Sequence, residues 1–447
     1  MTRKLGALMI PPCRAPSSPS GLMRGPVRRI CGQRSYVDRQ ADMKSGRVLA
    51  YGLLGMPLAF AALPIYVHVP RFYAQTAGLE LALIGFTLLA MRLLDAGIDP
   101  WLGWLADRLP RPRLLLLALL PLTLGFLALF NPPDGGATLW LVGSLALTYL
   151  GFSSATIALQ AWGADLGSNS TERTRLTAAR EGFALLGVVL AAALPTWLAT
   201  DLNEGVQRLS WLLPPLLVFA AWISLRYSGP SSPQFAPPVS LLISLREVFS
   251  DQAFRRLLIV FMANGIAAAL PATLFLFFVA DVLQNAAASG PLLALYFIAG
   301  AASLPLWVRL AARQGRVRAW LLAMGVALLA FAGAGLLRAG DVIPFAVICV
   351  ASGMALGADL ALPAAIAADI GERRGQAGTC FGAWNFVAKL NLALAAGLAL
   401  PLLGFLGYVP GAGEGLLALS FAYAFLPLAF KLLAAILLWR WRDSLEI

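Results

Sequence analysis

Three ionisable side chains lie within residues 80–105, a segment otherwise apolar enough to cross a bilayer as a helix. Arg92, Asp95 and Asp99 are spaced at i, i+3 and i+7, so a helix places all three on one face. A charged side chain at bilayer depth costs roughly 2.5 to 3.5 kcal/mol, so it faces a polar interior or a partner and indicates function by default. Arg92 can then pair with Asp95 while both carboxylates face one cavity.

Two carboxylates one helical turn apart repel each other when both are ionised, and a bound cation relieves that repulsion. Asp95 and Asp99 therefore predict a site for a coupling cation, with Arg92 in support. The alternative is a buried ion-pair network that only fixes how the helices pack. Lys389, in the middle of the apolar residues 379–406, needs a carboxylate partner because it lies too deep to reach water easily.

The composition is that of a polytopic membrane protein. Of 447 residues, 59% are hydrophobic and 13% are charged, and the mean hydropathy is +0.77, whereas a soluble domain has about 25% charged residues. Apolar runs of about 20 residues suit helices that span a bilayer and are far too long for barrel strands. The sequence predicts an all-α membrane protein with twelve transmembrane helices in two six-helix halves. We place these helices at residues 48–72, 80–105, 113–132, 137–163, 176–200, 206–227, 254–282, 289–311, 319–338, 342–368, 379–406 and 414–439.

We divide the chain into four parts. Residues 1–47 form a basic N-terminal segment that we expect to be disordered, because it is rich in Pro, Ser, Gly and Arg. It is a membrane-surface tail, a transit-like presequence or, as we favour, an extension upstream of a natural start at Met43. Residues 48–227 hold the N-terminal half, residues 228–253 a cytoplasmic linker, and residues 254–447 the C-terminal half with a short tail.

The distribution of the net charge of +12 along the chain indicates a membrane topology rather than binding to nucleic acid. Residues 1–42 carry eight basic and two acidic side chains, half of the excess, and most of the rest lies in loops on one side of the predicted membrane. The positive-inside rule then puts both termini in the cytoplasm. The chain contains 30 Arg and 4 Lys, a preference that GC-rich genomes encode, and this favours a bacterial protein of the inner membrane. The single histidine and four scattered cysteines have no metal-ligand spacing, so we predict no metal site and no cofactor besides the coupling cation.

The pattern Arg92-x-x-Asp95-x-x-x-Asp99-Pro100-x-x-Gly103 resembles the second helix of the melibiose-type carriers, the glycoside-pentoside-hexuronide:cation symporters of the major facilitator superfamily. Two shorter patterns extend the likeness: Gly103-x-x-x-Asp107-Arg108 and Gly407-Tyr408-Val409-Pro410. The resemblance implies a major facilitator fold. It also implies that the two aspartates bind the coupling cation and that Lys389 lies near them from the other half.

Five further residues are candidates for a substrate cavity. The resemblance implies that Trp162 and Arg180 face it, although Arg180 also suits a snorkelling position at the membrane interface. Asp359 lies in a helix that Gly and Pro interrupt, a common sign of a gating or binding point. Tyr66 and Asn385 add polar groups to an otherwise apolar lining.

The chain departs from the resembled pattern at four positions. The two aspartates that bind sugar in that family fall on Ala59 and Ala158, and a methyl group accepts no hydrogen bond from a sugar. Two neutral cation ligands fall on Ile98 and Ala155. Sodium needs about five or six oxygens, whereas a proton needs one carboxylate. We therefore expect coupling to H+ rather than Na+, and a substrate other than a simple sugar.

These observations predict a monomeric secondary active transporter that moves a small organic or amphiphilic solute with a cation by alternating access. Its partners are that solute and the lipid bilayer, without nucleic acid. An enzyme should show an activated nucleophile, a metal cluster or a nucleotide-binding loop, and the sequence shows none of these motifs. The alternatives are a sodium-coupled sugar symporter, a lipid or amphiphile transporter, and a membrane-embedded enzyme without transport.

Overall fold

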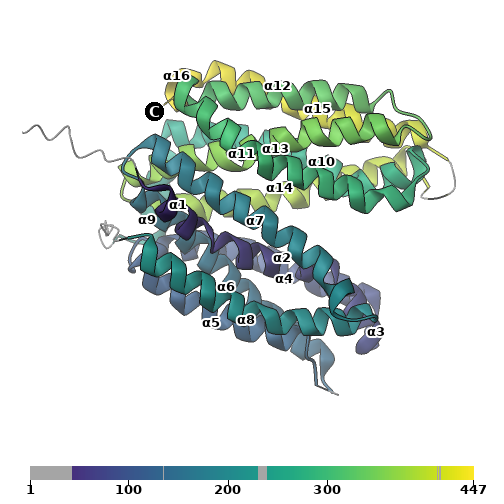
Figure 1. Ribbon diagram of the computed structural model, residues 1–447, viewed down its shortest axis with the longest axis horizontal. Coiled ribbons are helices and arrows are strands. Elements are labelled where there is room, and N and C mark those ends of the chain that lie inside the picture. The colour runs from purple at the N-terminus through teal and green to yellow at the C-terminus, as the bar shows by residue number, and fades with distance from the viewer. Residues whose placement is uncertain (1–42, 134, 230–238, 410, 412–413, 447) are drawn as a thin grey trace, which may run out of the picture. The chain divides into compact units, whose positions relative to one another are not determined.

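The structure is a computed structural model that describes residues 43–133, 135–229, 239–409, 411 and 414–446. The disorder that we predicted for residues 1–47 falls mostly on residues 1–42, which lie outside the described residues, as do residues 230–238 of the linker. The described chain is helical almost throughout (Figure 1). Within it, β pairing is limited to one isolated bridge between Val409 and Glu414.

The N-terminal half supplies six membrane crossings, of which the first is divided between two helices. Its elements are α1 (Ser45–Gly52), α2 (Gly55–Val67), α3 (Val69–Thr76), α4 (Leu81–Ala106), α5 (Arg111–Leu129), α6 (Ala137–Leu166), α7 (Ser170–Leu198) and α8 (Leu202–Tyr227).

The C-terminal half follows a short helix, α9, in the linker, and supplies six more crossings. The linker helix is α9 (Leu241–Ser250). The elements of the C-terminal half are α10 (Gln252–Phe277), η2 (Phe278–Val282), η3 (Ala286–Ala288), α11 (Ser289–Gln314), α12 (Arg316–Ala334), α13 (Val342–Arg373), α14 (Ala377–Phe405), α15 (Leu416–Arg440) and α16 (Arg442–Leu445).

The prediction of twelve transmembrane helices is confirmed. Eleven helical spans of the described chain are long and apolar enough to cross a membrane. The twelfth crossing is α4, which is 26 residues long and interrupts its apolar sequence with Arg92, Asp95 and Asp99. The helix that departs most from a simple hydrophobic span is therefore the one that carries the candidate site.

Most helix boundaries differ from the predicted ones by a few residues, and two of them differ because the helix continues beyond its apolar part. We predicted a helix that begins at residue 176, but α7 begins at Ser170 and so includes Arg173. The Asn169 side chain accepts a hydrogen bond from the Glu172 backbone N–H at 2.9 Å, and the Glu172 carboxylate accepts one from the Ser168 N–H at 2.8 Å. Such reciprocal capping fixes a helix start in polar sequence. Similarly, α13 runs on to Arg373 rather than ending at residue 368.

Glycines allow α4 and α14 to cross at very short range. A Cβ atom added to Gly103 would lie 2.3 Å from the backbone oxygen of Gly378, and one added to Gly382 would lie 2.5 Å from that of Asp99. Small residues permit this close approach between membrane helices. The crossing sets the distance between the carboxylates on α4 and the side chains on α14.

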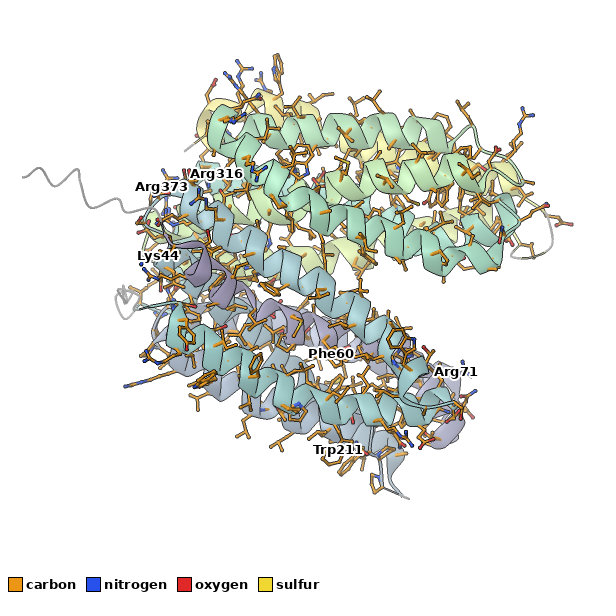
Figure 2. The ribbon with its side chains drawn as sticks, in the orientation of Figure 1. Lys44, Phe60, Arg71, Trp211, Arg316 and Arg373 are labelled. Carbon is orange, nitrogen blue, oxygen red and sulfur yellow. The ribbon has the colours of Figure 1, made fainter. Side chains whose placement is uncertain are left out.

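The two halves contact each other at one end of the bundle, which we name the Asp107 end. There the first turn of α14 binds Asp107 of the N-terminal half, and the ribbons of the halves lie closest where α1 and α9 lie (Figure 1). The opposite end, which we name the Tyr408 end, contains α3 and the connection from α14 to α15. Figure 2 shows Lys44, Arg316 and Arg373 at the Asp107 end and Arg71 at the other.

A substitution at the glycine crossing tests this packing. We expect Gly103→Leu to destabilise the protein by about 1 to 3 kcal/mol, the usual cost of overpacking, as measured by thermal unfolding of the purified protein in detergent. Gly97→Leu on the same helix is the control, because an added Cβ there meets nothing within 4 Å. Equal melting temperatures for the two variants would contradict the tight crossing.

Candidate functional site

The centre of the candidate site is an ammonium group between two carboxylates. Nζ of Lys389 on α14 lies 2.7 Å from Oδ2 of Asp95. It also lies 2.8 Å from Oδ1 and 2.7 Å from Oδ2 of Asp99. Asp99 is fully buried and Asp95 is 6% exposed. The structure thus brings together three of the predicted residues, from both halves, and with all three ionised the group has a net charge of −1.

Ser153 on α6 completes this arrangement, and we name Asp95, Asp99, Ser153 and Lys389 the coupling cluster. The Ser153 hydroxyl donates to Oδ1 of Asp95 at 2.6 Å and accepts a hydrogen bond from Nζ of Lys389 at 2.9 Å. Sequence reasoning missed Ser153 because the resemblance directed attention to Ala155, two residues further along α6. The available signal was the pair of neighbouring serines within an apolar helix.

Arg92 does not pair with Asp95, although the i, i+3 spacing allows it. Its guanidinium carbon lies 4.6 Å from the centroid of the Tyr66 ring, whereas the oxygens of Asp95 bind Ser153 and Lys389. A cation–π contact contributes about 0.5 to 1 kcal/mol at exposed sites and more where water is excluded. Arg92 and Tyr66 therefore form a separate pair within the N-terminal half.

Asn385 makes a second polar contact between the halves. Its Nδ2 donates to Oε1 of Gln160 on α6 at 2.7 Å and to the backbone oxygen of Phe381 at 2.9 Å. Asn385 lies one helical turn before Lys389 on α14, and Gln160 lies two turns after Ser153 on α6. The contact therefore extends the pairing of these two helices toward the Asp107 end.

Trp162 and Arg180 lie in packed surroundings of the N-terminal half. Trp162 is 1% exposed and packs edge-on against Tyr51, with 5.8 Å between the ring centroids. Its indole nitrogen has no hydrogen-bond partner among the described residues. Arg180 is 6% exposed and forms an ion pair with its neighbour Glu181. The structure does not bring either residue to the coupling cluster.

Asp359 belongs to a second buried ion pair, which lies wholly in the C-terminal half. Its Oδ2 binds Nζ of Lys431 on α15 at 2.5 Å, and its Oδ1 accepts a hydrogen bond from Nε1 of Trp320 on α12 at 2.8 Å. Lys431 is 5% exposed, so it is a paired residue rather than one that faces lipid. Asp359 also lines a cavity of about 560 Å³.

Asp107 binds the N-terminus of α14 from the opposite half. The first N–H groups of a helix have no partner within that helix, and Asp107 accepts hydrogen bonds from the backbone of Gly378 at 2.6 Å and of Thr379 at 2.7 Å. Arg111 holds the same carboxylate at 2.9 Å. A negative charge at a helix N-terminus is also favoured by the helix dipole. One buried side chain therefore joins α4 to α14.

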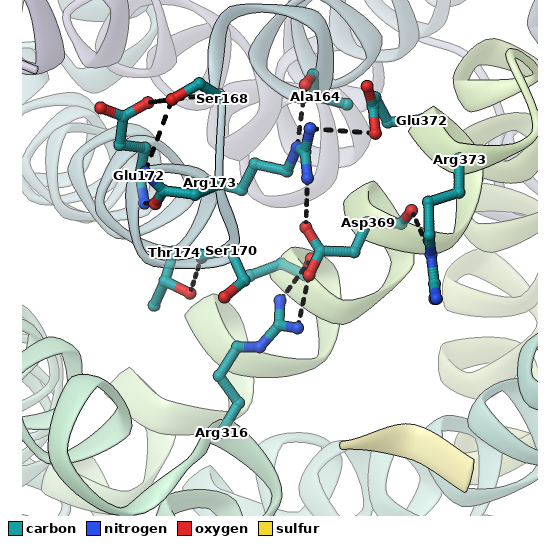
Figure 3. Close-up of polar contacts among 12 residues, drawn as sticks. Ala164, Ser168, Ser170, Glu172, Arg173, Thr174, Arg316, Asp369, Glu372 and Arg373 are labelled. Carbon is teal, nitrogen blue, oxygen red and sulfur yellow. Dashed lines mark hydrogen bonds and ion pairs between the residues drawn. The ribbon is translucent and has the colours of Figure 1, made fainter. Parts of the chain in front are cut away.

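Asp369 on α13 forms a further charged contact between the halves at the Asp107 end (Figure 3). It binds Arg173 of the N-terminal half at 2.8 Å and also pairs with Arg316 on α12. Arg173 reaches Glu372 as well, at 3.0 Å, and donates to the backbone oxygen of Ala164 at 3.1 Å. Asp369 is 3% exposed. Separation of the halves at this point would therefore remove the Arg173 guanidinium from a buried network of charges, which is costly.

The linker helix α9 and the start of α10 bind the connection between α13 and α14. Arg374 pairs with Asp251 at 2.7 Å, and Gln376 donates to Glu247 at 2.7 Å. Burial opposes ionisation of Asp251, but hydrogen bonds from the Phe254 backbone and from Arg374 outweigh it and lower the pKa of this carboxyl. Asp251 therefore stays charged and keeps Arg374 in place.

The coupling cluster gathers several acceptor oxygens around one ammonium group. Within the described residues, no group of three or more His, Cys, Asp and Glu side chains is arranged to hold a metal ion. The coupling cluster offers oxygens of two carboxylates and one hydroxyl, all within hydrogen-bonding distance of one ammonium group. A cation that neutralises one carboxylate would release Lys389 from it.

Comparison with known proteins places the chain among transporters. A family model described as MFS/sugar transport protein matches residues 48–442. Among solved structures, a bacterial homologue of the iron transporter ferroportin in an outward-facing state is 16% identical, with a TM-score of 0.71 over 90% of this chain and 100% of that one. The human organic anion transporter TETRAN is 18% identical, with a TM-score of 0.67 over 88% and 99%. The transporter FucP in its outward conformation is 13% identical, with a TM-score of 0.67 over 88% and 99%. At these identities the likeness shows the fold alone, and a comparison with curated protein sequences finds no match.

Charge removal tests whether the coupling cluster acts as a unit. Lys389→Met leaves two buried carboxylates without a counter-charge, and removing one partner of a buried pair costs about 3 to 5 kcal/mol. We expect the double variant Lys389→Met/Asp99→Asn to melt at a higher temperature than Lys389→Met alone, because one orphaned charge is gone. Thermal unfolding in detergent measures both, with Lys44→Met at an exposed position as the control. Equal destabilisation of the single and double variants would show that the groups are not coupled.

Proposed function

The chain belongs to the MFS/sugar transport protein family, which includes the melibiose-type symporters, and from this premise we propose that it couples solute movement to protons by alternating access. Its family and its structural neighbours are transporters rather than enzymes. The observation that carries the proposal is the position of Lys389, which binds Asp95 and Asp99 of the opposite half at once.

Protonation changes the charge that the two halves share. With both carboxylates ionised the coupling cluster has a net charge of −1, and one added proton brings it to zero. A neutral cluster is less costly to enclose in a low-dielectric interior. A protonated Asp95 or Asp99 also holds Lys389 less strongly, so α4 and α14 can separate. Proton binding thereby selects which conformational change is allowed.

We propose that the Asp107 end faces the cytoplasm. Basic side chains gather there, including Arg113, Arg173 and Arg318 in the first turns of α5, α7 and α12. At the Tyr408 end lie Arg71 in α3, Arg208 in the second turn of α8 and Arg338 after α12. The positive-inside rule favours this orientation in a bacterial inner membrane, with both termini inside. The closed contacts of Asp107 and Asp369 then belong to an outward-facing state.

The substrate is proposed to be something other than a simple sugar. Ala59 and Ala158 occupy the positions at which the resembled carriers use sugar-binding aspartates, and Ala158 is fully buried. A sugar needs several hydrogen-bond acceptors in fixed positions, and methyl groups supply none. The fold accommodates many substrates, so the family description alone does not decide the matter.

Sodium coupling is a second candidate, because Ser153 supplies an oxygen that the sequence analysis did not count. Two carboxylates and this hydroxyl offer five oxygens, within the range that a hard cation of this size uses. Lys389 would have to leave the cluster for Na+ to enter. We favour the proton because it needs only one carboxylate and no displacement of the ammonium group.

Transport in proteoliposomes separates these candidates. A panel of labelled sugars and uncharged amphiphiles is offered to the purified protein under an imposed pH gradient or Na+ gradient. We expect accumulation to follow the pH gradient. Asp95→Asn and Asp99→Asn should each lower it roughly tenfold or more, equivalent to about 1.4 kcal/mol of coupling, while Asp443→Asn, at an exposed acid, leaves it unchanged.

Two outcomes would contradict the proposal in different ways. Accumulation that follows Na+ at constant pH would favour the sodium candidate. Normal accumulation by both Asn variants would mean that the coupling cluster only fixes the packing of α4 against α14.

A further inference from the structure

The C-terminal half contains a cavity of about 560 Å³ whose wall includes residues from all six of its described crossings. This volume lies within the range of about 300 to 1,000 Å³ that is usual for small-molecule sites. Its wall consists mostly of Ala, Phe, Leu and Pro, with Ala268, Phe297 and Phe331 as examples from three helices. A solute rich in hydroxyls would leave most of them without partners against such a wall.

Three polar residues of the cavity wall lie near the middle of the membrane helices. Asp359, Asn391 and Lys431 come from the central parts of α13, α14 and α15. Phe275 and Phe345 come from the parts of α10 and α13 that approach the Tyr408 end. The cavity is therefore most strongly polar at mid-depth, whereas Ala and Phe side chains, together with the hydroxyl groups of Tyr296, Ser352 and Tyr423, line its part toward the Tyr408 end.

Asn391 lines this cavity and carries a hydrogen-bond acceptor without a partner among the described residues. Its side chain is 4% exposed, and its Oδ1 has no partner among the described residues, whereas its Nδ2 faces the backbone oxygen of Phe261 at 3.5 Å. A buried polar atom without a partner costs about 1 to 3 kcal/mol. A ligand that donates a hydrogen bond to Oδ1 would recover that cost.

The ion pair between Asp359 and Lys431 sets the charge of a suitable ligand. The two groups lie 2.5 Å apart and neutralise each other, while Trp320 occupies the other oxygen of Asp359. No other side chain on the cavity wall, as far as the structure describes it, carries a charge at neutral pH. A charged ligand would therefore bring an unmatched charge into an apolar space, which is costly.

We propose that this cavity binds an uncharged amphiphile whose hydrogen-bond donor meets Asn391 and whose apolar part packs against the Ala and Phe side chains of the wall. This proposal rests on the proposed function in one respect: it takes the bound molecule to be the transported solute. Asn391 follows Lys389 by two residues on α14, so one helix carries both the ligand contact and the coupling cluster.

Photolabelling in membrane vesicles without any ion gradient tests the site. The probe is an uncharged N-alkyl amide that carries a diazirine and an alkyne, and the labelled peptides are identified by mass spectrometry. We expect saturable labelling of α10 and α13. An excess of the unlabelled amide should suppress it, whereas the alkyl carboxylate and the alkyl trimethylammonium of the same chain length should not.

Variants of the cavity wall sharpen the result. Ala268→Phe and Ala272→Phe fill the space and should each abolish saturable labelling, whereas Gly325→Phe on α12 should not, because an added Cβ there meets nothing within 4 Å. Asn391→Leu should raise the competitor concentration for half-maximal suppression roughly fivefold, as expected for the loss of one hydrogen bond.

Labelling that survives both filling variants, or that the carboxylate suppresses as well as the amide does, would overturn the site. Because labelling needs no gradient, its absence would refute the site even where uptake is driven by protons. Uptake that does not depend on the pH gradient would refute the proposed function even where labelling is intact.

Discussion

The structure depends on the cost of holding two carboxylates at the centre of an apolar bundle. Asp95 and Asp99 lie on one face of α4 with almost no access to solvent, and in the part of the chain that the structure describes, the cation that pairs with both comes from the other half. Lys389 supplies the neutralising charge from α14, so the pairing of the halves and the neutralisation of the site are a single interaction. The glycines at the crossing of these helices allow the side chains to meet at hydrogen-bonding distance.

The same principle operates at the Asp107 end with different partners. There a carboxylate of one half meets backbone N–H groups of the other, and Asp369 meets Arg173. These bonds form only while that end is closed, so they stabilise one conformation without occupying the site in the middle. In the proposed cycle, the charge state of the coupling cluster decides when these bonds break. The cavity of the C-terminal half lies beside α14, where a bound solute would affect the same helix.

Much of this arrangement follows from the sequence, because the cost of placing charge in a membrane restricts the possibilities. The lengths of the apolar segments predict the number of crossings. Helical spacing predicts the shared face of Asp95 and Asp99, and the depth of Lys389 in an apolar segment predicts its need for a carboxylate. The role of Ser153 did not follow, because a hydroxyl in a membrane helix can bond to its own backbone and so gives little signal. The contact of Arg92 with Tyr66 was also out of reach. Helical spacing shows which side chains can meet within a helix, but not that Lys389 from another helix competes for the same carboxylate.

Infrared difference spectroscopy of the purified protein in lipid tests the central claim most directly, because it detects protonation of carboxyl groups without a known substrate. On acidification, the account predicts a carboxylic C=O stretching band that is lost in Asp95→Asn or Asp99→Asn and is insensitive to Na+. Absence of that band, together with carboxylate bands that shift when Na+ is added at constant pH, would contradict a proton-coupled site.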